Sequence, residues 1–432
     1  MKRLYKIFIS DKFLLIIYIF STINYILLIG LNNFSFPFRL NRNDGYHLLF
    51  TDWISKSYYE NVVEGTSILY NIFLKGIYNV VGNTDFSFVI LNLISQLFIL
   101  VIGIHILLKL KYKVKSLQFL IIITLYILYT LNLKSYHNSS NDTFLGVFVI
   151  LIIYLITFKL NKEVKSKVFI YVAVLLSFSF SIRITAIFLL PLISVYFYTW
   201  FKTSNLTLLH KLRYLSIFFL SFLFVLTAFH YPSIINNKKL SYEIKDPINL
   251  NLNWTQRNYL GLKKIELGKE QLHRDAIWKY TKFEEVKKYV EINGENSLPK
   301  SMSEFILKDP ILYLKISTYN VLNSLIRFIR FWGFLFLFTL YPLFYFRKNK
   351  ASHKLLSSVS FIILIFLISF SCLTFIEFRW FFGYEILIPM GVLSFLNFNE
   401  LKNKLNMNAI FASSLILVTL FNFRSIFSFV YN

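Results

Sequence analysis

Charged residues and cysteine are both scarce in this chain. Charged side chains make up 16% of its 432 residues, whereas a soluble domain carries about 25%. The one cysteine, Cys372, cannot form an intramolecular disulfide. Hydrophobic residues instead make up 56% of the sequence, and the mean hydropathy is +0.57. The composition excludes a soluble enzyme, a disordered chain and a scaffold held together by disulfides.

Glycine, proline and several kinds of motif are sparse as well. The 13 glycines and 8 prolines form neither a glycine-rich phosphate loop nor an internal repeat. Cysteine and histidine show no metal-ligand spacing. Transporters of broken-helix design interrupt a matching helix in each half of the chain, and no such pair is seen. The sequence therefore gives no sign of a nucleotide-binding loop, a cysteine–histidine metal site or a broken-helix transporter.

Long apolar stretches take the place of these features. There are eleven, each of roughly 16–24 residues, near the length at which a helix crosses a bilayer. They are 13–31, 86–108, 117–133, 143–158, 168–182, 184–201, 214–230, 331–346, 355–376, 382–398 and 408–430. We therefore predict an all-α, polytopic membrane protein with about eleven transmembrane helices. No small-residue cleavage site follows the first stretch, so we expect this helix to be retained.

The positive charges alternate along the chain. Clusters of lysine recur at the N-terminus and in every second short gap between apolar stretches, while the other short gaps hold only Lys134, Arg183 and Arg379. The positive-inside rule then places the N-terminus in the cytoplasm and predicts a multi-pass protein of the cytoplasmic membrane, if the source is bacterial. Topology and contact with anionic lipid account for the net charge of +24, so a nucleic-acid partner is not needed.

Acidic residues have the opposite distribution. Only Asp11, Glu163 and Glu400 lie near the predicted cytoplasmic face. Chemistry on a cytoplasmic nucleotide needs carboxylates that hold a metal on the phosphates, and this face has almost none. If the protein is an enzyme, its site is expected on the outer face, where a lipid carrier would have to supply the activated substrate.

Two segments on the predicted outer face are long, namely 32–85 and 231–330. Within the second, 269–291 has apolar residues at helical spacing, which predicts an amphipathic helix on the protein or membrane surface. Asp309-Pro310 predicts a break before the next helix. We expect three parts, a transmembrane module with a catalytic first outer loop, an outer subdomain and the last transmembrane helices, over 1–230, 231–330 and 331–432.

The first candidate acid, Asp44, follows the first apolar stretch in the segment Arg42-Asn43-Asp44-Gly45-Tyr46-His47. A carboxylate where a helix leaves the bilayer costs free energy unless it has partners or a task. Arg42 and His47 are near enough in sequence to hold it ionised. The alternative is a solvated loop acid.

The second candidate acid, Asp142, precedes the fourth apolar stretch. It could be a helix N-cap, a functional carboxylate, or both. Arg183 lies in a gap of two residues between apolar stretches, and an arginine at that depth needs an anion.

A third group of candidates, Glu377 and Arg379, begins the tenth stretch from its outer end. The two side chains could neutralise each other, or Arg379 could face a phosphate, which its planar fork suits. His137, Lys134 and Glu385 are weaker candidates that we expect to be structural.

The order of these motifs resembles the GT-C class of integral-membrane glycosyltransferases, in particular the dolichyl-phosphate-mannose-protein mannosyltransferase-like and aminoarabinose-transferase-like group. The likeness covers most of the chain, through topology more than identity. The stretches that carry it are 44–47 with 64–70, 141–145, 309–314 and 377–381. Gly45 stands where the family often has a second acid, which leaves open whether a divalent metal is bound. Trp380 replaces the usual tyrosine.

The resemblance implies an inverting transfer of a sugar from a polyprenyl-phosphate donor to a glycan, lipid or protein acceptor. By that likeness Asp44 is the general base, Arg183 and Arg379 bind the lipid phosphate, and Asp142 orients the acceptor or supports Asp44. Two other functions stay open. One is a polymerase or ligase of lipid-linked oligosaccharides, and the other is a flippase of lipid-linked sugars.

Overall fold

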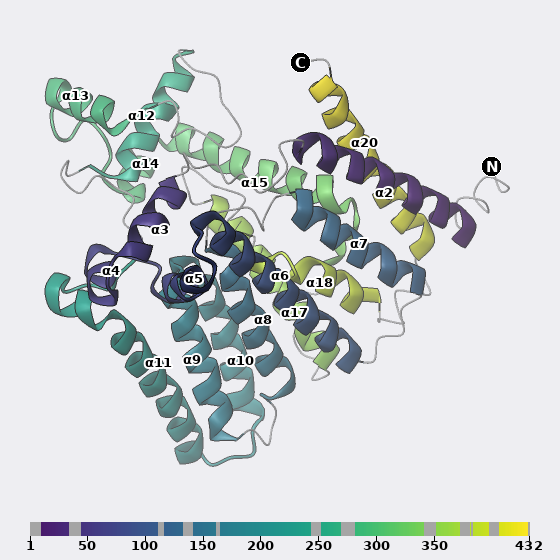
Figure 1. Cartoon of the computed structure of the whole chain (residues 1–432), viewed down its shortest axis with the longest axis horizontal. Helices are drawn as coiled ribbons and strands as arrows, with labels where there is room; N and C mark the ends of the chain where they lie inside the picture. The colour runs from purple at the N-terminus through teal and green to yellow at the C-terminus, as the bar shows by residue number, and fades with distance from the viewer. Residues whose placement is uncertain are drawn as a thin grey trace. The chain divides into compact units, whose positions relative to one another are not determined.

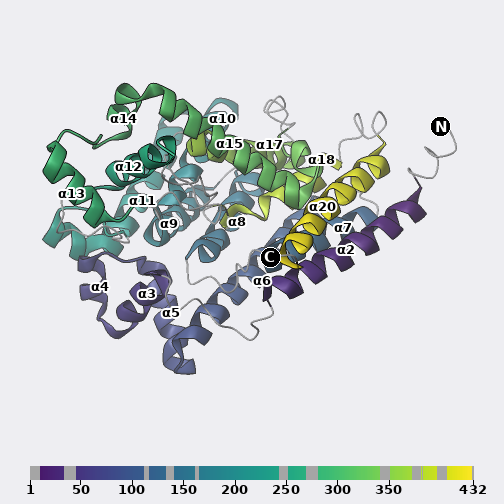
Figure 2. The same cartoon turned by 90° about the horizontal axis from the view of Figure 1, so that it is seen from above.

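The chain is helical throughout the part that a computed structural model describes. The described residues are 10–33, 45–110, 116–132, 141–160, 165–242, 252–268, 281–340, 351–371, 381, 383–396 and 406–430, and no strand occurs among them. The helices form two compact units, drawn from two directions in Figures 1 and 2. The first unit comprises Met1–Glu243, Phe328–Ile363 and Phe381–Asn432, and the second comprises Ile244–Arg327 and Leu364–Trp380.

The first unit contains most of the apolar helices. In chain order these are α2 (Asp11–Asn33), α3 (Gly45–Ser55), α4 (Tyr58–Glu64), α5 (Ile68–Val81), α6 (Thr84–Lys109), α7 (Ser116–Asn132), α8 (Asp142–Phe158), α9 (Ser166–Ile182), the 3-10 helix η1 (Ile184–Phe188), α10 (Leu189–Thr203), α11 (Leu208–Asn237), α16 (Leu335–Phe338), α18 (Leu387–Leu396) and α20 (Met407–Val430). In both views α8 and α9 lie side by side, and α2 runs along α20. Helices α15 (Pro310–Trp332) and α17 (Ala351–Ser371) each contribute residues to both units.

Within the described residues, four helical segments are long and apolar enough to cross a membrane. They are Asp11–Ile29, Thr84–Lys109, Ile184–Thr203 and Leu208–Asn237. These confirm an all-helical protein with helices that could span a bilayer, but the predicted count of eleven spans is not confirmed. Among the shorter apolar helices, α8 and α9 have 17 residues each and reach about 25 Å, against a hydrocarbon core of about 30 Å.

Helix α6 shows how the first unit differs from a soluble bundle. Its exposed positions carry large apolar side chains, whereas many of its buried positions are small or polar. The exposed residues include Leu93, Ile94, Leu97, Phe98 and Val101, and the buried ones include Ser87, Asn92, Ser95 and Gly103. Small and polar residues at helix contacts, with bulky apolar residues outside, are typical of helices that pack within lipid.

The starts of three helices are joined by side-chain hydrogen bonds. Asn408 Nδ2 at the start of α20 donates to Asp11 Oδ1 at the start of α2, over 2.7 Å. Gln118 Nε2 at the start of α7 donates to Asn408 Oδ1, over 3.4 Å. The alternation of lysine clusters predicts these three starts on one side of the membrane, so the contacts agree with the predicted relative directions.

The segment between α2 and α6 contains three helices. Ser57 and Glu60 form a capping box at the start of α4. This helix is attached to the end of α11, because Tyr58 Oη donates to the Phe229 carbonyl over 2.6 Å and Asn237 Nδ2 donates to the Val63 carbonyl over 2.7 Å. We predicted an outer segment over 32–85 without an apolar stretch, whereas α5 is an apolar helix of 14 residues within it.

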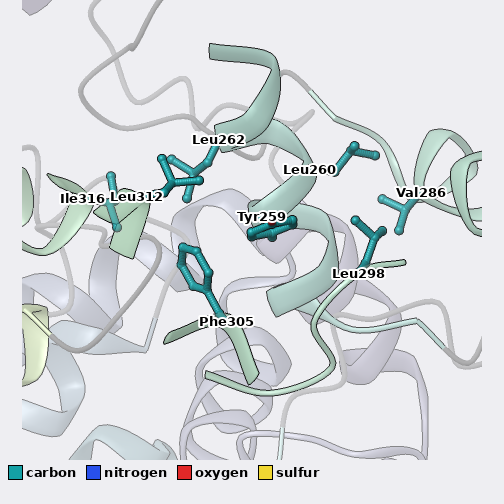
Figure 3. Close-up of a cluster of buried hydrophobic side chains, with 8 residues drawn as sticks. All are labelled: Tyr259, Leu260, Leu262, Val286, Leu298, Phe305, Leu312 and Ile316. Carbon is teal, nitrogen blue, oxygen red and sulfur yellow. The ribbon is translucent and has the colours of Figure 1, made fainter. Parts of the chain in front are cut away.

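The second unit has its own small core. Besides the first part of α15, it contains α12 (Trp254–Glu266), α13 (Phe283–Asn293) and α14 (Met302–Lys308). Tyr259 lies at the centre of the buried cluster and packs against Phe305 with ring centroids 5.1 Å apart (Figure 3). On α13, Phe283 and Val286 are buried while the residues between them are exposed, which is the alternation expected of an amphipathic helix. The earlier part of that expected helix, 269–280, lies outside the described residues.

The predicted break at Asp309-Pro310 separates α14 from α15. Asp309 Oδ1 accepts a hydrogen bond from the Leu312 amide over 3.2 Å, and its other oxygen pairs with Lys263. Partial burial raises the pKa of Asp309, but the hydrogen bond from Lys263 and that from the Leu312 amide outweigh it, so the net pKa is lowered. The same contact raises the pKa of Lys263. The turn into α15 is thus held by a charged cap.

Two glycines allow a close backbone contact in the first unit. A methyl group at Gly146 on α8 would stand 2.7 Å from Ile99 Cδ1 and 2.9 Å from the Gly383 carbonyl oxygen. A methyl group at Gly383 would stand 2.7 Å from the Asp142 carbonyl oxygen. Only glycine lets these two segments approach so closely.

We predict that Gly146→Ala lowers the free energy of unfolding by about 1–3 kcal/mol, because the added methyl group overpacks the contact. Gly76→Ala is the matched control, since no atom lies within 4 Å of a methyl group there. Alanine in a helix is favoured over glycine by up to about 1 kcal/mol, so this variant should be as stable as the wild type or more stable. Thermal unfolding in detergent measures both. Equal stability of Gly146→Ala and the wild type would contradict the contact.

Candidate functional site

The structure brings two predicted site residues together. Asp142 is the first residue of α8, and Arg183 lies between α9 and η1. Arg183 Nη1 is 3.0 Å from Asp142 Oδ1. The exposed fractions are 6% for Arg183 and 1% for Asp142. The anion that Arg183 requires is therefore a carboxylate 41 positions earlier in the chain.

Asn141 completes the surroundings of this ion pair. Arg183 Nη1 donates to Asn141 Oδ1 over 2.6 Å. The same amide group donates through Nδ2 to Ser67 Oγ over 2.7 Å and to the Ile182 carbonyl over 2.8 Å. Ser67 Oγ in turn donates to the Ile182 carbonyl over 2.5 Å. One buried amide thus links the start of α8, the end of α9 and the residue before α5. We refer to Ser67, Asn141, Asp142 and Arg183 as the arginine cluster.

The N-cap interpretation of Asp142 needs a correction of one residue. Asn141 occupies the N-cap position of α8, and Asp142 is the first helical residue. The Asn141 side chain makes no cap hydrogen bond, because it is engaged with Arg183 and Ser67. A carboxylate in the first turn is still favoured by the helix dipole, so Asp142 stabilises both the helix start and the arginine.

A chain of polar contacts extends from the arginine cluster toward α11. The Thr66 amide donates to Ser241 Oγ over 3.0 Å, and the Ser241 amide donates to His230 Nδ1 over 3.0 Å. His230 Nε2 lies 3.4 Å from Ser181 Oγ on α9. Because Nδ1 accepts, the proton of the neutral ring is on Nε2, which donates to Ser181. The loop that carries Ser67 is thereby tied to two helices.

The short segment before α18 packs against the backbone of Asp142 and against η1, which follows Arg183. Gly383 lies against the backbone of Asp142, as its close contact shows. Tyr384 Oη donates to the Thr185 carbonyl in η1 over 3.0 Å, two residues after Arg183. This segment is buried.

Glu385 forms a second polar group next to this segment. It is 1% exposed, and Gln96 Nε2 donates to its Oε1 over 2.9 Å. Tyr126 Oη donates to Gln96 Oε1 over 3.2 Å. Sequence reasoning placed Glu385 among the weak candidates and overlooked Gln96 and Tyr126. The usable signal was a glutamine in the middle of a long apolar stretch, since polar residues inside spans usually have a partner or a function.

Most other predicted site residues cannot be placed. Tyr46 and His47 belong to α3, which begins at Gly45, directly after Asp44. Their side chains and the whole of the remaining candidates lie outside the described residues. Those remaining candidates are Arg42, Asp44, Lys134, His137, Glu377 and Arg379. Over the described ranges, no group of three or more His, Cys, Asp or Glu side chains could hold a metal ion.

Comparison with known proteins adds no further assignment. No protein family, no curated protein and no solved structure matches this chain. The residues of the chain and the order of its motifs are therefore the basis for inferring its function.

We predict that Arg183→Met lowers the free energy of unfolding by about 3–5 kcal/mol, because it leaves the Asp142 carboxylate buried without its cation. The double variant Arg183→Met/Asp142→Leu should recover most of that loss, since two apolar side chains replace the pair. The remaining loss, about 1–3 kcal/mol, reflects the Asn141 oxygen that no longer accepts a hydrogen bond. Thermal unfolding of the single and double variants measures this. A double variant that is less stable than Arg183→Met would contradict the pairing.

Proposed function

We propose that the protein is a membrane glycosyltransferase of the GT-C type, which moves one sugar from a polyprenyl-phosphate carrier to an acceptor on the outer face of the cytoplasmic membrane. The observation that carries the proposal is the buried arginine cluster, in which Arg183 is held by Asp142 and Asn141. A buried guanidinium fixed by three neighbouring elements is the kind of group that stabilises charge on a leaving phosphate.

The reaction needs one base and one cationic site. The acceptor hydroxyl gives its proton to the Asp44 carboxylate, and its oxygen forms a bond to the anomeric carbon of the sugar. The bond from that carbon to the phosphate oxygen breaks, and polyprenyl phosphate leaves with the electron pair. Attack from the face opposite the leaving group inverts the anomeric configuration. The proton and the electron pair are both accounted for without a metal. A divalent ion at the phosphate site would add positive charge there.

Arg183 and Arg379 are proposed to meet the phosphate. A planar guanidinium donates two parallel hydrogen bonds to a phosphate, and it stays charged in a dry site. Asp142 holds Arg183 at the start of α8, which is consistent with the supporting role implied by the resemblance. Arg379 lies four residues before Gly383, and Gly383 packs on the Asp142 backbone. Sequence proximity therefore favours both arginines near one point.

The place of Asp44, the proposed general base, in the sequence is consistent with this site. Asp44 directly precedes α3, and α3 packs against α5. Ser67 immediately precedes α5 and belongs to the arginine cluster. In the sequence, Asp44 therefore directly precedes a helix that packs against the helix beginning next to Ser67.

The first test of this function is Asp44→Asn in the purified, detergent-solubilised protein. Loss of a general base typically lowers the rate about 10²–10⁴-fold, while membrane insertion and thermal unfolding should be unchanged. Asp52→Asn is the matched control, because Asp52 is an exposed acid on α3 that pairs with Lys56. It should transfer sugar at the wild-type rate. Near-normal transfer by Asp44→Asn would remove Asp44 from its role.

The product distinguishes the rival functions. Mass analysis should show one sugar added to the acceptor, whereas a whole oligosaccharide would indicate a polymerase or ligase. Transfer in detergent, with no compartments present, cannot come from a flippase. Movement of lipid-linked sugar across vesicles without any transfer product would support the flippase instead.

A further inference from the structure

Four consecutive residues, Gly383 to Ile386, connect the arginine cluster to the middle of α6. Gly383 meets the backbone of Asp142, and Tyr384 donates to the Thr185 carbonyl. Glu385 accepts from Gln96. Ile386 packs at Gly103, where a methyl group would stand 3.3 Å from its Cδ1. The segment therefore touches the Asp142 backbone and η1, which follows Arg183, at one end and α6 at the other.

Gln96, the residue of α6 that binds Glu385, is polar although it lies within an apolar helix. Gln96 lies near the middle of α6, and Glu385 and Tyr126 are buried beside it. A carboxyl group at such a depth costs free energy unless it is hydrogen-bonded. Gln96 is fixed from both sides, since Tyr126 donates to its oxygen and its own nitrogen donates to Glu385. With both ends of its amide bonded, the Gln96 side chain is expected to hold one geometry.

The alternative for a buried carboxyl group is chemistry of its own, such as proton transfer or binding of a cation. Within the described residues, Glu385 Oε2 has no hydrogen-bond partner, and no group of three candidate ligands occurs. The contacts of this segment run through Glu385 Oε1 and through its neighbours Gly383, Tyr384 and Ile386. They favour a mechanical role over an ionic one.

We propose that Glu385 is a positioning residue, whose hydrogen bond with Gln96 fixes residues 383–386 and thereby the geometry of Asp142 and Arg183. Its consequence for sugar transfer rests on the proposed function, whereas the anchoring of the segment does not.

The variant Glu385→Gln distinguishes a positioning role of residue 385 from chemistry of its carboxyl group. Glu385→Gln keeps an oxygen that accepts from Gln96 but cannot ionise or exchange a proton at this atom. Glu385→Ala removes the acceptor. Gln96→Leu removes the donor from the other side of the bond. Gln118→Leu is the matched control, because Gln118 also lies on an apolar helix but bonds to Asn408 at the start of α20.

The experiment measures hydrogen exchange of the backbone amides in 383–386 and 184–188, for the full chain in nanodiscs. Glu385→Ala and Gln96→Leu should each raise exchange about tenfold or more, as expected when a hydrogen bond in a buried network is lost. Glu385→Gln and Gln118→Leu should exchange like the wild type in these residues. Unchanged exchange in Glu385→Ala would overturn the proposal, as would equal disruption in Glu385→Gln and Glu385→Ala.

Transfer kinetics form the second arm. A misplacement of about 1 Å in a site can cost about 10²-fold in rate, so Glu385→Ala and Gln96→Leu should lower kcat by about that factor. Glu385→Gln should rescue kcat to within about threefold, since positioning needs only the hydrogen bond. Loss of transfer in Glu385→Gln with wild-type exchange would show that the carboxyl group itself is required, and would overturn the proposal. If the wild type transfers no sugar, the proposed function fails, and the exchange data alone decide the anchoring.

Discussion

Burial of the Arg183 guanidinium is the constraint on which the rest of the first unit depends. Arginine does not lose its charge in a protein, so a buried arginine must be given an anion and acceptors for its N–H groups. Here Asp142 supplies the anion and Asn141 supplies an acceptor. Because Asn141 also holds Ser67 and the Ile182 carbonyl, three elements that are far apart in the chain must converge at one point. A helix N-terminus, a helix C-terminus and a loop are each fixed by the same side chain.

Convergence at the arginine cluster also needs space, and the glycines provide it. Gly146 and Gly383 allow the segment before α18 to touch the backbone of α8. Packing of this kind replaces the hydrophobic effect as the force between helices in lipid, where apolar side chains gain little by leaving one apolar environment for another. Hydrogen bonds such as those of Gln96 and Tyr384 then select one arrangement among the possible packings. The bulky apolar side chains on the outside of α6 take no part in that selection.

Sequence patterns located the helices better than the contacts between them. Apolar runs place α2, α6, α8 and α9 within about two residues at each end, because burial in lipid demands continuous apolar segments, whereas α11 extends well beyond the run predicted for it at both ends. The need of Arg183 for an anion was also visible, and Asp142 was already a candidate. What the pattern could not provide was the pairing of Asn141 with Ser67 or of Gln96 with Glu385. Those partners are 74 and 289 positions apart, and hydropathy contains no information about which polar residues of different spans meet.

The central claim is that the anchored arginine binds a lipid phosphate, and binding of polyprenyl phosphate without a sugar tests it most directly. The wild type and the double variant Arg183→Met/Asp142→Leu are compared in detergent by native mass spectrometry. The double variant is chosen because it avoids most of the loss of stability expected of Arg183→Met. The account predicts that the double variant binds at least about tenfold more weakly, because a charge-assisted hydrogen bond contributes about 1.5–3 kcal/mol. Equal affinity of the two proteins for polyprenyl phosphate would contradict the account.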